Sequence, residues 1–459
     1  MRIAFVSGNR ETLPDAVIPL GLLYIAASTP EDHEKQVWDL CFEEEPHAAL
    51  AAHLEAWPPD VVALGMRNIQ NNDYSGTADN LNYYKALIAT IRSRTTAPIV
   101  LGGGGFSVMP EALTRHLQPD FGISGEGETA FVRLLEAVQR GDGDYSQVHN
   151  LHRFVDGAVV STPPAPAFQV LDTLPMPDRR LVDPRHYAHY GIDSVQTKRG
   201  CALKCDYCTY PLIEGRSTRS RDPKLVVDEM QLSAQRVPNL RHVFLVDSVF
   251  NLPPSHAKAV CRELIARKWQ IPWSAYANPI AFDQELAELM VAAGCAGIEI
   301  GADSGVDSVL DRMKKGFRSE AITRMHGICE RAGLKDCYTF ILGTPGETIA
   351  DVRATLDFCV KLDPFAAILM VWLDDEETLD AALAGQRRAL RSEIKDLVKE
   401  SADDFPRWII PPLGVNFDPV LLAMLRKTGR SGPLWQHIGL AGADRRTRRL
   451  RRTTEARIS

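Results

Sequence analysis

Three cysteines lie within eight residues of this 459-residue chain, at Cys201, Cys205 and Cys208. Thiolates held on one short loop can bind a single iron-sulfur cluster, and three of them leave one iron of a 4Fe-4S cluster without a protein ligand. Structural zinc sites use four protein ligands, and neither a second Cys-x-x-Cys pair nor a His-x-x-x-His pair follows here. The spacing therefore favours a 4Fe-4S cluster over zinc, and three packed cysteines on a turn are the alternative.

The pattern Cys-x-x-x-Cys-x-x-Cys, with Gly200 before it and the aromatic Tyr207 before its last cysteine, resembles the signature of the radical S-adenosylmethionine (SAM) enzymes. The resemblance implies that the open iron chelates the amino and carboxylate groups of SAM. It also implies that Tyr207 belongs to the cofactor-binding site.

The composition is that of a large enzyme. The formal net charge of -7 and the isoelectric point near 6.0 argue against a nucleic-acid-binding body. No signal peptide precedes the first apolar run, and no run approaches the roughly 18 apolar residues of a membrane helix. The six cysteines outside the motif are scattered through patterned segments, which indicates reduced thiols. We expect a cytoplasmic protein that binds no membrane.

The first 140 residues alternate short apolar runs with helical stretches, which is the pattern of a parallel sheet wound with helices. The expected strands are residues 2–7, 61–65, 99–102 and 121–124, and a helix is expected over residues 20–28. In such a sheet, ligands bind at the carboxyl ends of the strands. This first domain is predicted to span residues 1–145.

Two glycine-rich loops follow strands of this domain. Four glycines at 102–105 let the backbone approach a ligand closely, and Gly125-Glu-Gly-Glu128 leaves amide donors at the start of a helix. Each loop is equally compatible with a tight strand-to-helix turn. Together they resemble the cobalamin-binding domain found in one branch of the radical SAM family. The resemblance implies the cobalamin-binding residues Gly103, Gly104, Gly105, Ser107, Gly125, Glu126, Gly127 and Glu128.

The lower face of the cobalamin is assigned to residues 66–72, which follow another strand. No Asp-x-His-x-x-Gly motif occurs in this domain, so cobalt is expected to lack a histidine ligand. We expect Arg67 to lie beneath the cobalt without ligating it, since a fixed positive charge disfavours a cationic, six-coordinate metal. Asn68 is expected to contact the same cofactor. A surface or phosphate-binding arginine is the alternative.

A proline-rich linker is predicted over residues 146–190, because proline continues neither a helix nor a central strand. From there to residue 375 the strand–helix alternation returns. Six strands are expected, at residues 194–198, 243–246, 273–277, 297–300, 338–342 and 366–371. Six such units form a partial (β/α)6 barrel of the TIM type, as the resemblance implies, with reactive groups at the carboxyl ends of the strands.

Several of these strand ends resemble family motifs. Asp247 is expected near the reaction chamber, and Tyr276 at the end of another strand is a catalytic candidate or a packing residue. Asp303 stands where many relatives carry glutamate. The residues for which the resemblance implies SAM or cofactor contacts are Asn278, Glu299, Asp303, Ser304, Gly343 and Pro345.

Residues 376–459 match no motif and are expected to form a small helical cap. The sequence predicts a charged helix over residues 379–400 and an extended stretch over residues 408–412 that closes over the barrel. The basic run at 445–452 is typical of a solvated tail, and contact with an acidic partner or leader peptide is the alternative.

The combined resemblance implies a cobalamin-dependent radical SAM methyltransferase. Such an enzyme moves a methyl group from SAM through methylcobalamin to a carbon of a small-molecule or peptide natural-product precursor. An external electron donor of the flavodoxin or ferredoxin type is expected. A ring rearrangement or cyclisation without methyl transfer, and a non-catalytic iron-sulfur or corrinoid carrier, are the alternatives.

Overall fold

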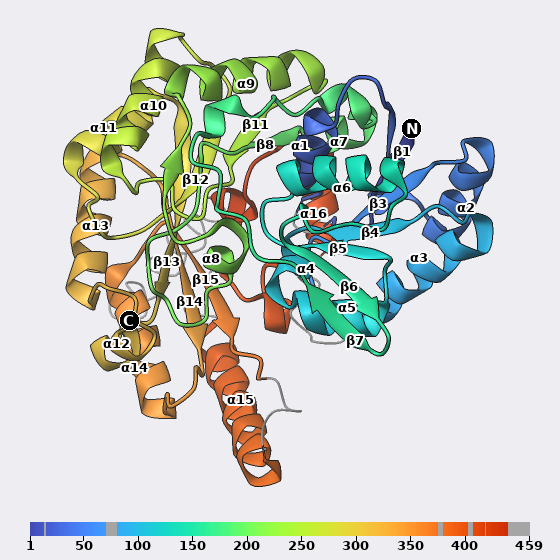
Figure 1. Ribbon diagram of the computed structural model, residues 1–459. Coiled ribbons are helices and arrows are strands. Elements are labelled where there is room, and N and C mark those ends of the chain that lie inside the picture. Colours follow the sequence, from blue (N-terminus) through green and yellow to red (C-terminus); the bar gives the residue numbers. More distant parts are fainter. Residues whose placement is uncertain (13–14, 70–79, 375–379, 403–406, 418, 439–459) are drawn as a thin grey trace, which may run out of the picture. The chain divides into compact units, whose positions relative to one another are not determined.

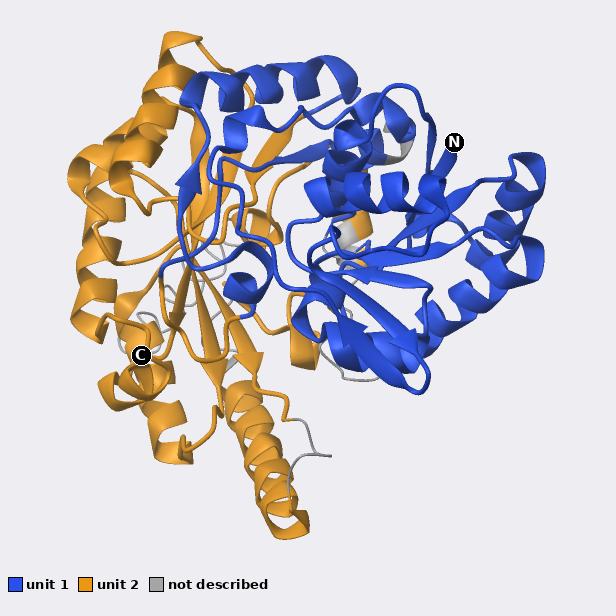
Figure 2. Ribbon diagram, in the orientation of Figure 1, with its two compact units in different colours: residues 1–72, 77–202, 209–240 blue, residues 73–76, 203–208, 241–459 orange. Residues whose placement is uncertain are grey.

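The computed structural model describes residues 1–459 apart from 13–14, 70–79, 375–379, 403–406, 418 and 439–459 (Figure 1). The chain divides into two compact units (Figure 2). The first contains the described residues up to 240 except 203–208, and the second contains residues 203–208 and those described from 241 onward. Each unit is built on a mainly parallel sheet with helices, so the predicted α/β class is confirmed. The predicted domain boundaries stay a prediction.

Seven strands form the main sheet of the first unit, in the order β2-β1-β3-β4-β5-β6-β7. They are β1 (Arg2–Ser7), β2 (Glu34–Asp39), β3 (Val61–Gly65), β4 (Ile99–Gly102), β5 (Phe121–Ile123), β6 (Leu151–Val155) and β7 (Ala158–Ser161). Strands β1 to β5 pair in parallel, and β6 and β7 add an antiparallel edge. The chain leaves β1 for β2 on one side and then returns to β3 on the other. This reversal is the point at which doubly wound sheets bind ligands.

Helices cover both faces of this sheet (Figure 1). One face carries α1 (Leu20–Ser28) and α6 (Glu128–Arg140), and the other carries α2 (Pro46–Ala56), α3 (Asn80–Arg94) and α5 (Pro110–Leu117). Successive strand residues enter opposite cores: Val6 and Leu64 belong to the cluster with α2, α3 and α5, whereas Phe5 and Ala63 belong to the cluster with α6. A strand buried on both faces needs apolar residues at every position.

The segment predicted as a linker has structure of its own. It contains β6, β7, two short 3-10 helices and α7 (Pro184–Tyr190). The proline-rich stretch 162–168 follows β7 with neither helix nor strand. After it, the first unit continues with β8 (Ile192–Val195), β9 (Lys198–Arg199), the short helix α8 (Tyr210–Glu214), β10 (Arg219–Ser220) and α9 (Pro223–Arg236). Strands β9 and β10 form an antiparallel ribbon.

Six strands of the second unit pair in parallel in the order β16-β15-β14-β13-β12-β11. They are β11 (His242–Leu245), β12 (Trp273–Ala277), β13 (Cys295–Asp303), β14 (Asp336–Leu342), β15 (Ala366–Val371) and β16 (Trp408–Ile409). The intervening helices are α10 (Pro254–Ala266), α11 (Gln284–Ala292), α12 (Asp307–Arg312), α13 (Ser319–Ala332) and α14 (Ile349–Leu362). With β8, strands β11 to β15 correspond to the six strands predicted for the barrel.

The C-terminal region contains α15 (Ala381–Ala402), the 3-10 helix at Pro411–Leu413 and α16 (Pro419–Lys427). The stretch predicted to be extended includes β16, which pairs with β15. The basic run at 445–452 lies outside the described residues. No helix in the described part of the chain is long and apolar enough to cross a bilayer.

Candidate active site

The cysteine motif lies on the loop between β9 and α8. Gly200 has a φ of +82°, and a Cβ on it would lie 2.1 Å from the Ser217 carbonyl oxygen, so only glycine fits there. The amide of Cys201 donates to the Gly215 carbonyl oxygen at 3.2 Å. Cys201 is buried, Cys205 and Cys208 are half-buried, and all three are free of disulfides. Three cysteines without disulfide bonds on one loop fit the donor set of an iron-sulfur cluster.

No group of three or more His, Cys, Asp or Glu side chains in the described residues is gathered as a metal ion would require. The assignment of the three cysteines to a cluster therefore rests on their spacing, their lack of disulfide bonds and the comparisons below. It stays a proposal residue by residue.

Tyr207, between the last two cysteines, is held by a buried ion pair. Its hydroxyl donates to Asp303 Oδ2 at 2.5 Å, and Lys315 Nζ lies 2.5 Å from the same oxygen. Asp303 is 2% exposed and Lys315 is 4% exposed. Burial, followed by the Asp303 charge, raises the pKa of the Tyr207 phenol, so it remains a donor. The Asp303 oxygen predicted to contact SAM is thus engaged with the cysteine loop.

Two further predicted SAM-binding segments are held by their own hydrogen bonds. Ser304 Oγ lies 2.9 Å from Thr355 Oγ1 and accepts from the Val306 amide. In the Gly343–Pro345 turn, Glu347 Oε2 accepts from the amides of Gly343 and Thr344, both at 2.8 Å. These bonds fix both turns before any ligand binds.

Asn278 is fixed by a neighbouring asparagine. Asn251 Nδ2 donates to the Asn278 carbonyl oxygen at 3.0 Å, and the Asn278 amide donates to Asn251 Oδ1 at 2.8 Å. Asp247, at the end of β11, is completely buried. The Asn251 side chain therefore joins the loop after β11 to the backbone of the loop after β12.

Glu299 and Tyr276 are register partners on one face of the second sheet, and both are more exposed than the residues next to them in their strands. Ile298 and Ile300 are completely buried, but Glu299 between them is only partly buried. Tyr276 is paired with Glu299 in the strand register and is 37% exposed. Its ring packs edge-on against Phe244, with 5.0 Å between centroids. This face presents an aromatic surface beside a carboxylate.

The Glu299 carboxylate has an unusual environment. Trp435 Nε1 donates to Glu299 Oε1 at 2.8 Å. Burial raises the pKa of Glu299 to about 7, and the Trp435 hydrogen bond opposes part of that rise. A carboxyl group with such a pKa exchanges protons near neutral pH.

The first glycine loop of unit 1 lies directly on the segment after β3. A Cβ on Gly103 would lie 2.6 Å from the Met66 carbonyl oxygen, and one on Gly105 would lie 2.9 Å from the Asn68 carbonyl carbon. Gly103 has a φ of +105°. The loop therefore packs directly on the backbone of residues 66–68, at the carboxyl ends of the strands where a doubly wound sheet binds its ligand, and this region is the predicted corrin surface.

The residues predicted beneath cobalt lie beside this loop. Arg67 is exposed and Asn68 is half-buried, and the rest of that segment, residues 70–72, lies outside the described part of the chain. Ser107 Oγ donates to the Gly103 carbonyl oxygen and accepts from the Gly125 amide, each at 2.8 Å. Ser107 therefore joins the two glycine loops.

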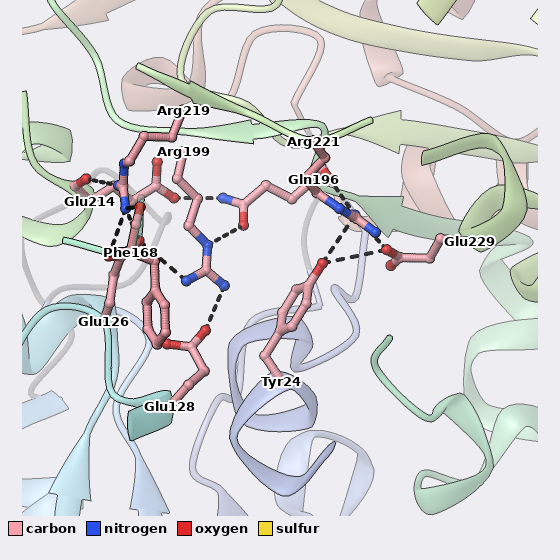
Figure 3. Close-up of polar contacts among 10 residues, drawn as sticks. All are labelled: Tyr24, Glu126, Glu128, Phe168, Gln196, Arg199, Glu214, Arg219, Arg221 and Glu229. Atoms are coloured by element: carbon pink, nitrogen blue, oxygen red, sulfur yellow. Dashed lines mark hydrogen bonds and ion pairs between the residues drawn. The ribbon is translucent and has the colours of Figure 1, made fainter. Parts of the chain in front are cut away.

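The structure changes the interpretation of the acidic residues in the second glycine loop. The side chains of Glu126 and Glu128 are 9% and 5% exposed, and both carboxylates form ion pairs with arginines of the β9–β10 ribbon (Figure 3). Gly127 precedes the first residue of α6. This loop can therefore contact a cofactor through its backbone, because the carboxylates of Glu126 and Glu128 are paired with arginines of the same protein.

Sequence reasoning assigned no contact to the residues that support the site. They are Arg199, Arg219, Asn251, Lys315 and Trp435. A buried cation requires an anionic partner, but nothing in the sequence distinguishes Lys315 from its exposed neighbour Lys314. The one available signal is the position of Arg199, two residues before the first cysteine.

Two protein-family models match parts of this sequence. The sequence matches the Radical SAM superfamily over residues 195–359 and the B12 binding domain over residues 7–135. The tryptophan 2-C-methyltransferase of Streptomyces laurentii is 31% identical over 426 residues, which cover 79% of this chain and 70% of that protein.

Two solved structures have a fold similar to that of this chain. The radical SAM methyltransferase TsrM from Kitasatospora setae, with cobalamin and a [4Fe-4S] cluster bound, is 27% identical, with a TM-score of 0.71 over 81% of this chain and 72% of that one. A structure of TsrM with tryptophan and a SAM analogue matches the fold with a TM-score of 0.79 over 99% of both chains, at 23% identity. The chain belongs to the cobalamin-dependent radical SAM enzymes, and it is a methyltransferase whose cofactors are cobalamin, a 4Fe-4S cluster and SAM.

Proposed function

We propose that the protein methylates an aromatic carbon of a small molecule of the tryptophan or indole type. The observation that carries this proposal is the similarity over most of both chains to a tryptophan 2-C-methyltransferase. In the overall reaction, the aromatic carbon gains the methyl group and loses its hydrogen as a proton, while SAM becomes S-adenosylhomocysteine. Electrons balance without any further oxidant or reductant.

The proposal assigns a set of residues to each cofactor. Cys201, Cys205 and Cys208 would hold the cluster, and the glycine loops with Ser107 would hold the corrin. The turns at Ser304 and Gly343 would contact SAM. When bound, these groups supply the methyl group, its carrier and the iron that orients SAM.

The aromatic face of the second unit supports the substrate class. Phe244 and Tyr276 form an edge-on pair, and Tyr276 leaves more than a third of its surface open. Aromatic rings favour such offset and edge-on contacts with one another, so an indole is a suitable ligand for this surface. The exposed phenol of Tyr276 would bind the substrate rather than fill a core.

Glu299 would accept the proton that methylation releases. Its neighbours in the strand register are Tyr276 on one side and Cys337 on the other, and the Trp435 indole donates to one carboxylate oxygen. Burial holds its pKa near neutrality, where a general base works best. The resemblance predicts a SAM contact for Glu299, but these surroundings favour a base.

The proposal includes a flavodoxin- or ferredoxin-type electron donor, which keeps the reduced cofactors active, and it includes no nucleic-acid partner. A peptide that contains tryptophan is the competing acceptor, and the assay below distinguishes it from free tryptophan.

The test is anaerobic reconstitution with cluster and cobalamin, followed by incubation with methyl-deuterated SAM. L-Tryptophan, tryptamine and a tryptophan-containing peptide are offered in parallel, and products are identified by mass spectrometry and NMR. We expect a deuterated methyl group on an indole carbon of a small molecule, and one S-adenosylhomocysteine per product. Methylation of a saturated carbon with release of deoxyadenosine, or a product of unchanged carbon count, would overturn the proposal.

A further inference from the structure

Four buried charges connect the second glycine loop to the β9–β10 ribbon (Figure 3). Arg219 Nη1 lies 2.8 Å from both carboxylate oxygens of Glu126. Arg199 Nη2 donates to Glu128 Oε1 at 2.6 Å, and its Nη1 reaches Glu126 Oε1 at 3.3 Å. All four side chains are at most 9% exposed. Two acids and two arginines make the group electrically neutral.

The two arginines lie at the two ends of the cysteine loop. Arg199 and Arg219 are register partners on the antiparallel ribbon, and the chain between them carries all three cysteines and α8. Glu214 also bonds both ends: its carboxylate accepts from the Gly200 amide and the Gln196 side chain, and its carbonyl oxygen accepts from the Arg219 guanidinium. Glu126 and Glu128 of the glycine loop therefore form ion pairs with both ends of the cysteine loop.

The same glycine loop is bonded to the predicted corrin surface. The Gly125 amide donates to Ser107 Oγ, one residue before Glu126. Ile213 of α8 lies against both glycine loops: a Cβ on Gly104 would be 3.6 Å from its Cδ1, and one on Gly125 would be 3.7 Å from its carbonyl oxygen. A continuous set of contacts thus joins the corrin surface to the ends of the cysteine loop.

Arg199 also contacts a second group of residues, which consists of Tyr24, Arg221 and Glu229. The Arg199 guanidinium lies 5.1 Å from the centre of the Tyr24 ring, and Arg221 bonds both the Tyr24 hydroxyl and Glu229 (Figure 3). Buried ion pairs contribute little net stability compared with apolar packing, and their best-supported role is to fix one arrangement. The network is therefore suited to positioning.

We infer that Glu126 and Glu128 are positioning residues for the cysteine loop, and that corrinoid binding and cluster assembly strengthen each other through them. Ordering the glycine loops around a corrin fixes the two carboxylates, which in turn fix Arg199 and Arg219 at the ends of the loop. Coupling of this kind is reciprocal, so each cofactor raises the affinity for the other by the same factor. The inference depends on the cofactors and not on the substrate.

The experiment measures that factor. Hydroxocobalamin is titrated anaerobically into protein with and without the reconstituted cluster, and the dissociation constant is read from the cobalamin absorbance. In a second experiment, the rate at which the cluster loses iron to a chelator is measured with and without hydroxocobalamin. For the native chain we expect the cluster to tighten cobalamin binding by about fivefold or more, and cobalamin to slow iron loss.

Glu126→Gln keeps the shape and removes the charge, and it should bring the ratio of the two dissociation constants close to one. The matched control is Glu136→Gln, which removes the same charge from an exposed pair with Arg133 on α6 and should leave the ratio unchanged. Arg219→Lys keeps the charge but cannot bond Glu126 through one nitrogen and the Glu214 carbonyl oxygen through a second, so it should give an intermediate ratio and serves if the first variant does not fold.

If the role of Glu126 is purely structural, Glu126→Gln should weaken the binding of both cofactors and lower the melting temperature, but leave the ratio of the two cobalamin dissociation constants unchanged. That result, or a native ratio of one, would overturn the inference. Failure of the methylation assay with every acceptor would leave these ratios unaffected, so the two proposals fail separately.

Discussion

The Tyr207 hydroxyl donates a 2.5 Å hydrogen bond to the carboxylate of Asp303, a residue 96 positions further along the chain. This bond ties the segment between Cys205 and Cys208 to the end of β13. Lys315 completes the group by pairing with the same carboxylate oxygen. The cysteine loop is thus anchored by a buried acid whose charge is balanced.

Lys315→Met should be far more destabilising than Lys314→Met. Lys315 pairs with the buried Asp303, whereas Lys314 pairs with the exposed Asp206 at 2.7 Å. Removing Lys315 leaves a buried carboxylate unbalanced, which costs about 3–5 kcal/mol, whereas an exposed pair contributes less than about 1 kcal/mol. Urea unfolding of the two cluster-free variants measures the difference. Equal midpoints would contradict the assignment of Lys315.

Tyr207→Phe should retain iron but change the cluster's environment. The three cysteines remain, so iron content should match the native protein. Losing a hydrogen bond to a charged group costs about 1.5–3 kcal/mol of stability. Because the loop then loses its anchor at Asp303, we expect an altered electron paramagnetic resonance signal of the reduced cluster with SAM. Unchanged stability together with an unchanged signal would show that the bond anchors nothing.

The buried strands were predictable because parallel strands covered on both faces are continuously apolar. Residues 2–7, 61–65 and 99–102 match β1, β3 and β4 in full. Strand β2 was missed because Glu34–Asp39 lies at the edge of the sheet and is mostly polar. An edge strand is recognisable only from the partner that it pairs with.

The hairpin of β6 and β7 was missed although its signal was present. Asp156 and Gly157 separate two strands rich in β-branched and aromatic residues, and both have positive φ, at 50° and 80°. Asp-Gly between such strands is typical of a two-residue hairpin. The nearby prolines favoured a linker interpretation instead.

The motifs of the candidate site were legible, but their connections were not. Glycine loops and cysteine spacing are local patterns. The pairing of Glu126 with Arg219 spans 93 positions, and only the folded sheet brings the two residues together. For the same reason the sequence offered Asp303 as a SAM contact and gave no sign of its partner Lys315.

Gly105→Ala should weaken cobalamin binding, whereas Gly104→Ala should not. A methyl group at 105 would lie 2.9–3.1 Å from backbone atoms of Arg67 and Asn68, so that segment must move. At 104 the nearest backbone atom is 3.4 Å away, which is ordinary contact. We expect at least a tenfold rise in the cobalamin dissociation constant for the first variant alone, equivalent to about 1.4 kcal/mol. Equal affinities would place the cofactor away from this loop.

The stability of the protein should depend on pH through Glu299. Its pKa is about 7 in the native protein, against 4.5 for an ordinary glutamate. Between these values the native protein retains a proton that the unfolded chain has released, so the free energy of unfolding falls as pH rises from 4.5 to 7. The loss is at most about 3 kcal/mol and should disappear in Glu299→Gln. Denaturant unfolding at several pH values compares the two slopes, and equal slopes would contradict the raised pKa.

The rate of methylation should rise with pH through the same group. A base must be deprotonated, so the rate should increase up to an apparent pKa near 7 and then level off. Trp435→Phe removes the hydrogen bond that favours the charged carboxylate, so it should move this apparent pKa upward. Glu299→Gln should abolish the pH dependence and most of the rate while SAM still binds. A native pH profile in Trp435→Phe, or full activity in Glu299→Gln, would remove Glu299 from the reaction.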